Sequence, residues 1–124
     1  MDRLKTAAVW ALQFVLAGLF AVQGIVKVTG SSAWISRFKG WGYPDHFYFS
    51  IGLAELSGAI VLIIPRLAKY GASTLILVMA GATVTHLIHH EPQVMTTLVL
   101  LALLAAILYL RRGSTPTSPR KILP

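Results

Sequence analysis

Four long apolar stretches constrain this chain more than any other feature of its sequence. They run approximately over residues 6–28, 47–64, 67–88 and 94–110. A helix rises about 1.5 Å per residue, so about 20 residues cross the hydrocarbon core of a bilayer. Inside a bilayer the backbone must satisfy its own hydrogen bonds, and none of the stretches alternates like a barrel strand. The sequence therefore predicts an all-α integral membrane protein built as a four-helix bundle.

The composition favours the same class of protein. Of the 124 residues, 56% are hydrophobic and 12% are charged, whereas a soluble domain carries about 25% charged residues. The formal net charge is +7, and the basic residues flank the apolar stretches, which points to anionic membrane lipid rather than nucleic acid. The chain contains no cysteine, which excludes disulfides, dithiol catalysis and iron–sulfur ligation. A redox role would therefore need an organic cofactor or a partner subunit.

Turn-forming residues mark the borders of the stretches. Pro65 separates the second stretch from the third. Asp45 precedes the second stretch, and we expect it to cap that helix. The first stretch exceeds the length of a signal-peptide core, so we expect it to be retained. After Arg112 the chain becomes polar and rich in proline, which predicts a transmembrane domain over residues 1–112 and a disordered cytoplasmic tail over residues 113–124.

Basic residues are unevenly distributed over the two sides of such a bundle. With four spans, both termini lie on one side. That side carries eight Lys and Arg residues: Arg3, Lys5, Arg66, Lys69, Arg111, Arg112, Arg120 and Lys121. The other side carries three: Lys27, Arg37 and Lys39. The positive-inside rule thus predicts a multi-pass protein of the inner (cytoplasmic) membrane with both termini in the cytoplasm.

The outer loop between the first two stretches is rich in aromatic residues. Trp34, Phe38 and Trp41 have the spacing of one face of a short helix, and Tyr48 follows close to the start of the next stretch. Amphipathic rings favour the headgroup layer, so one interpretation is an anchor lying on the membrane surface. The other interpretation is a lid over a cavity between the helices. The sequence leaves both open.

Few polar side chains interrupt the apolar stretches, and such groups usually face protein or water. Glu55 lies about nine residues into the second stretch, in the outer half of the predicted membrane span. Lys27 and His86 are cationic partners for it, and Gln23, one turn deeper than Lys27, is expected to be the better-placed hydrogen-bond partner. The candidate ligand-binding site comprises Gln23, Lys27, Glu55, Thr83 and His86. The alternative is a buried network that only fixes helix register.

Two further features bear on this candidate site. Gly52 and Gly58 share a helix face with Glu55, and small residues there permit either close helix contact or room for a ligand. His86 and His90 are four residues apart, a spacing that suits a metal on a helix, but only Glu91 lies near the pair. We therefore predict no metal site.

Glycines and single polar residues recur in each stretch in a pattern that resembles a known family. They are Gly18, Phe20, Gly24 and Lys27 in the first stretch, Gly52, Glu55 and Gly58 in the second, Pro65, Ala68, Tyr70 and Ala72 around the following turn, and Gly81 and His86 in the third. Over roughly residues 6–110 the chain resembles the DoxX family of small four-helix membrane proteins. The namesake is a membrane subunit of an archaeal thiosulfate:quinone oxidoreductase, and other relatives are partners in membrane oxidoreductase complexes or assembly factors. The resemblance implies that Lys27 and Glu55 occupy the family's recurrent polar positions.

Three functions are compatible with these features. The first is an accessory subunit of a membrane redox system, with membrane lipid and a redox protein as partners and a small outer-half pocket that binds quinone or lipid. The second is an assembly factor or chaperone for membrane proteins. The third is a transporter of a small solute or protons, which the apolar inner halves of the stretches disfavour. Ser57 points away from Glu55 on its helix, which argues against a hydrolase; whether the chain is an enzyme stays open.

Overall fold

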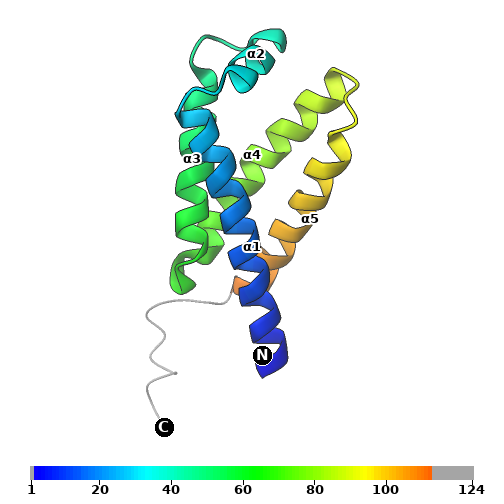
Figure 1. The fold of residues 1–124 in the computed structure, drawn as a ribbon. Helices are drawn as coiled ribbons and strands as arrows, with labels where there is room; N and C mark the ends of the chain where they lie inside the picture. Colours follow the sequence, from blue (N-terminus) through cyan, green and yellow to red (C-terminus); the bar gives the residue numbers. More distant parts are fainter. Residues whose placement is uncertain (1, 113–124) are drawn as a thin grey trace.

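The computed structural model describes residues 2–112, and the regular structure within them is entirely helical (Figure 1). Its elements are α1 (Arg3–Val28), α2 (Ser32–Gly40), α3 (Phe47–Leu62), the 3₁₀ turn η1 (Pro65–Leu67), α4 (Ala68–Ile88) and α5 (Val94–Arg111). The prediction of an all-α chain is confirmed for this range. The predicted tail over residues 113–124 lies outside the described residues.

Three of the helical segments are long and apolar enough to cross a membrane. They are α1, the continuous segment of η1 and α4 (Pro65–Ile88), and α5. The fourth apolar stretch forms α3, which is shorter, with 16 residues. The apolar stretches of the sequence therefore all become helices, and many large hydrophobic side chains on them are exposed.

The helices pack in the order α1, α3, α4, α5. The N-terminus, η1 and the end of α5 lie at one end of the molecule, which we call the terminal end; α2 and the α4–α5 turn lie at the other, the α2 end (Figure 1). Toward the α2 end, the α4–α5 hairpin leans away from the α1–α3 pair (Figure 1). The two pairs thus form a V that narrows toward the terminal end.

Glycines allow the helices within the α1–α3 and α3–α4 pairs to approach closely. A Cβ on Gly24 would lie 2.8 Å from the carbonyl oxygen of Gly52, and a Cβ on Gly71 would lie 2.6 Å from the amide nitrogen of Leu62. A Cβ on Gly58 would lie 2.8 Å from the Leu75 side chain. Of the two interpretations of the small residues near Glu55, the structure supports close helix contact at Gly52 and Gly58.

The terminal half of the V is filled. Its core comprises Leu16, Phe20, Leu62, Leu75, Leu104 and Ile107, each nearly inaccessible to solvent. Next to this core, the buried Gln13 donates a hydrogen bond to the Leu62 carbonyl (2.8 Å) and accepts one from Arg111 Nε (2.8 Å). This glutamine therefore connects α1 to the last turn of α3 and to the end of α5.

The beginnings of two helices differ from expectation. The prediction that Asp45 caps the second long helix is wrong, because the N-cap of α3 is His46, whose φ of 68° turns the chain and whose side chain makes no capping hydrogen bond. The first helix begins a turn earlier than the apolar stretch, because the Asp2 side chain accepts a hydrogen bond from the Lys5 amide (2.8 Å). Neither end is marked by the apolar pattern itself.

A polar cavity beneath helix α2

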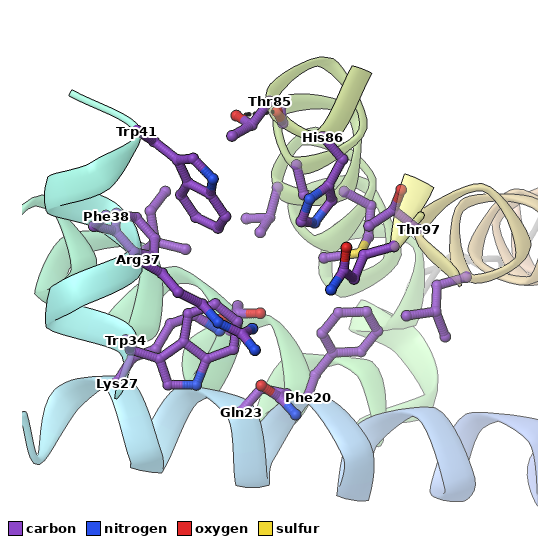
Figure 2. A pocket seen from close by; sticks show the side chains of 18 of the residues that line it. Phe20, Gln23, Lys27, Trp34, Arg37, Phe38, Trp41, Thr85, His86 and Thr97 are labelled. Carbon is purple, nitrogen blue, oxygen red and sulfur yellow. Dashed lines mark hydrogen bonds and ion pairs between the residues drawn. The ribbon is translucent and has the colours of Figure 1, made fainter. Parts of the chain in front are cut away.

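A cavity of about 430 Å³ occupies the open part of the V, covered by α2 (Figure 2). Most of its wall is apolar. It is lined by Leu19, Phe20, Gln23, Lys27, Trp34, Arg37, Phe38, Trp41, Tyr43, Phe47, Ile51, Glu55, Leu77, Val78, Met79, Gly81, Ala82, Thr85, His86, Gln93, Thr96, Thr97 and Leu100. Four of the five candidate ligand-binding residues therefore line this cavity, as do three of the four candidate lid residues.

The most buried polar group on this wall is an ion pair between α1 and α3. Lys27 Nζ lies 2.8 Å from Glu55 Oε1, and the two residues are 4% and 2% exposed. The expectation that Gln23 would be the better-placed partner is wrong. Gly52 leaves space against the Cβ of Lys27, so the lysine stem can lie on α3 and extend inward to the carboxylate. Glu55 Oε1 nevertheless has no well-aligned hydrogen-bond donor.

A tryptophan joins this ion pair to α2. Lys27 Nζ lies 3.9 Å from the centroid of the Trp34 ring, and Arg37 Cζ lies 4.8 Å from the same centroid. Both cations thus contact one aromatic ring, an arrangement stabilised by the ring quadrupole. Figure 2 shows the Arg37 side chain extending over the cavity toward Gln23.

A second polar cluster ties α2 and the segment after it to the end of α4. His86 Nδ1 lies 2.7 Å from Glu91 Oε1, and Trp41 Nε1 donates to Glu91 Oε2 (3.3 Å). The Tyr43 hydroxyl forms a hydrogen bond with the Thr85 hydroxyl. The pKa of Glu91 is lowered, chiefly by the hydrogen bond with His86 and despite some desolvation. The hydrogen bond from Trp41 and the charges of the His86 and His89 imidazoles act in the same direction. His86 is therefore a partner of Glu91 rather than of Glu55.

The aromatic residues that are candidates for a lid or an interfacial anchor pack around one ring. Phe38 is 6% exposed, and its ring contacts those of Trp34, Trp41 and Tyr48. Trp34, Phe38 and Trp41 line the cavity, whereas Tyr48 does not. The helix expected from the aromatic spacing is present as α2, with Trp41 directly following its last residue.

Thr83 is turned away from the cavity. Its hydroxyl donates to the Met79 carbonyl (2.7 Å) and lies within hydrogen-bonding distance of the Thr97 hydroxyl (3.0 Å). It therefore fastens α4 to α5 behind the cavity wall.

Two charged residues were not among the sequence candidates: Arg37, which lines the cavity, and Glu91, which forms hydrogen bonds with two residues of its wall. Arg37 lies three residues after Trp34, so the i, i+3 spacing on a short helix was a usable signal. Glu91 follows α4, and only the turn geometry brings it back to His86. Within residues 2–112 no group of three His, Cys, Asp or Glu residues could hold a metal ion. His90 lies beyond the end of α4 with φ 55°, so the helical His86–His90 spacing is not kept.

Comparison with known proteins places this architecture in a family. The model of the DoxX-like family matches residues 11–108, a range that includes most of α1, all of α2, α3 and α4, and most of α5. Comparison with curated proteins and with solved structures gives no match. The chain belongs to the DoxX-like family, and its apolar helices make it a membrane protein.

Proposed function

We propose that α1, α3, α4 and α5 all cross the inner membrane, with both termini in the cytoplasm and α2 on the outer surface. Three of these helices have the length and hydropathy of spans, and α3 packs between α1 and α4. The excess of basic residues at the terminal end supports this orientation. The test is a topology reporter fused to either end of the chain. A reporter signal from the outer side of the membrane would contradict the proposal.

We further propose that the chain is an accessory subunit of a membrane redox system whose cavity binds the headgroup of a quinone. The observation that carries this proposal is a largely apolar cavity with its polar groups gathered beneath an aromatic cover. Pockets between bundle helices with a few convergent polar groups are common ligand sites. The aromatic rings offer stacking surfaces for a quinone ring, and Gln23, Lys27 and His86 offer donors to its carbonyl oxygens.

The chain's own residues set limits on such a role. It has no cysteine, so electrons would pass between the quinone and a partner protein rather than through thiols of this chain. The packed core and the Gln13 hydrogen bonds fill the terminal half of the V. A transport path would have to cross that core, so binding is favoured over transport.

Two glycines provide a matched test of quinone binding. Gly81 lies on the cavity wall, Gly18 does not, and a Cβ at either position would meet no neighbour within 4 Å. The full-length chain in lipid nanodiscs should bind a short-chain benzoquinone saturably. Gly81→Leu should lose binding because its side chain occupies part of the cavity, and Gly18→Leu should retain it. Absence of saturable binding by the wild type, or equal binding by both variants, would overturn the proposal.

A further inference from the structure

The charges on the cavity wall do not balance. Lys27 and Glu55 neutralise each other at 2.8 Å, whereas Arg37 forms no ion pair with a carboxylate of residues 2–112. Glu91 is engaged by His86 and Trp41, and Asp45 lines a separate small hollow beside α2. One positive charge, that of Arg37, therefore remains on the wall without an acidic partner.

The Arg37 guanidinium is positioned to bind an anion. It lies over the Trp34 ring, with Cζ 4.8 Å from the centroid, and its side chain extends over the cavity (Figure 2). Stacking uses the flat face of a guanidinium and leaves its N–H edges free, and these edges match the oxygens of a carboxylate or of a deprotonated hydroxyl beside a carbonyl.

The buried carboxylate fixes where an anion can sit. Glu55 is 2% exposed, whereas Arg37 is exposed, and Glu55 already neutralises the Lys27 charge at 2.8 Å. An anionic group is therefore favoured beside Arg37, at the α2 end of the cavity, rather than beside Lys27. The remaining wall toward the terminal end is apolar, with Leu19, Phe20 and Leu100 among its residues, and it suits a hydrocarbon tail.

From this arrangement, and resting on the proposed role of the cavity as a ligand-binding site, we infer that its ligand is an amphiphile whose headgroup carries one negative charge. The charge binds Arg37 while the tail lies against the apolar wall. Two sources share this chemistry: an acidic hydroxyquinone in its deprotonated form and a long-chain carboxylate. Arg37 is solvent-exposed, so the preference for a charged ligand comes from the charge-assisted hydrogen bond that an anion adds.

Matched ligand pairs test the charge requirement. The full-length chain in phosphatidylcholine nanodiscs at alkaline pH is titrated with a 2-hydroxy-3-alkyl-1,4-naphthoquinone and the same quinone without the hydroxyl. The second pair is a long-chain fatty acid and its alcohol. We expect the charged member of at least one pair to bind about tenfold more tightly, the ratio given by one charge-assisted hydrogen bond. The pair with the tighter charged member identifies the source.

Two variants on the same helix assign this preference to Arg37. Arg37→Gln should reduce the charged-to-neutral ratio to about one, because it removes the cation and keeps much of the side-chain length. Lys39→Gln removes an equal charge from α2 at a residue that does not line the main cavity, and it should keep the wild-type ratio.

The outcomes separate the inference from the proposed function. Equal binding of the charged and neutral members in both pairs would overturn the charge requirement, and saturable binding of the neutral quinone would then leave quinone binding standing. A ratio unchanged by Arg37→Gln, or equally lost in Lys39→Gln, would overturn the role of Arg37. No binding of any of the four ligands by the wild type would overturn both.

Discussion

The Lys27 ammonium on α1 and the Glu55 carboxylate on α3 lie 2.8 Å apart at the closest approach of the two helices, next to Gly24 and Gly52. Removing one member of a buried ion pair leaves the other charge uncompensated, which costs about 3–5 kcal/mol, whereas replacing both by apolar residues is often tolerated. We expect Lys27→Met to lower the thermal unfolding temperature in detergent strongly, and Lys27→Met combined with Glu55→Leu to recover much of the loss. Additive losses in the double variant would contradict a direct pairing.

Substitution by alanine at two glycines of α1 should change the stability of the protein in different ways. A Cβ on Gly24 would lie 2.8 Å from backbone atoms of α3, where no side chain can move aside, but a Cβ on Gly18 meets nothing within 4 Å. Gly24→Ala should therefore destabilise the protein, and Gly18→Ala should be neutral or stabilising by up to about 1 kcal/mol, since alanine is the better helix former. Unfolding in detergent followed by circular dichroism measures both. Equal effects would show that α1 and α3 are not in close contact at Gly24.

The Gln13 side chain should contribute more to stability than Gln23 on the same helix. Gln13 is fully buried and hydrogen-bonded on both sides, to the Leu62 carbonyl and to Arg111. Gln13→Leu removes both bonds, and loss of buried partners costs about 1–3 kcal/mol. Gln23 lies on the cavity wall, so Gln23→Leu should change the unfolding temperature little. Equal losses would place the important glutamine contact elsewhere.

The contact between Trp41 and Glu91 should break in acid. The pKa of Glu91 lies below its ordinary value of 4.5, chiefly because of the hydrogen bond with His86. A lowered folded-state pKa means that the stabilisation is present above the ordinary value and is lost as the pH falls through the lowered one. The Trp41 indole N–H resonance should therefore shift with a midpoint below 4.5.

Internal controls are available for that titration. Trp10 lies on α1 toward the terminal end, and its indole N–H resonance should not shift over the same pH range. The Glu91→Gln variant should abolish the shift of the Trp41 resonance. A midpoint at or above the ordinary value, or a shift that persists in Glu91→Gln, would contradict the hydrogen bond between Trp41 and Glu91 as its cause.

The four long helices could be predicted from the sequence because each coincides approximately with one hydrophobic stretch. The start of α3 could not, because Asp45 has the chemistry of a cap but the left-handed backbone of His46 places it outside the helix. Similarly, depth along α1 favoured Gln23 as the partner of Glu55. The reach of a lysine stem over a glycine on the neighbouring helix depends on how the two helices cross, which a single sequence does not encode locally.

Residues of the outer loop were the hardest to assign to the cavity. The aromatic spacing indicated α2 and left open whether the helix is an anchor or a cover; in the structure its side chains line the cavity. Arg37 was counted only for its charge, and Glu91 only as part of a turn. Arg37 is placed by stacking on Trp34, which also contacts Lys27 across the turn between α1 and α2, and Glu91 is placed by the contact with Trp41, which is distant in sequence.

The unequal lengths of α1 and α3 have a consequence for the surrounding lipid. The helix α1 has 26 residues and is about 39 Å long, whereas its neighbour α3 has 16 residues and is about 24 Å long. The first can tilt to fit a hydrocarbon layer of about 30 Å, but the second is too short for it, so acyl chains beside α3 must compress or disorder. The protein should therefore deform the bilayer on one flank only, and shorter-chain lipids should gather there.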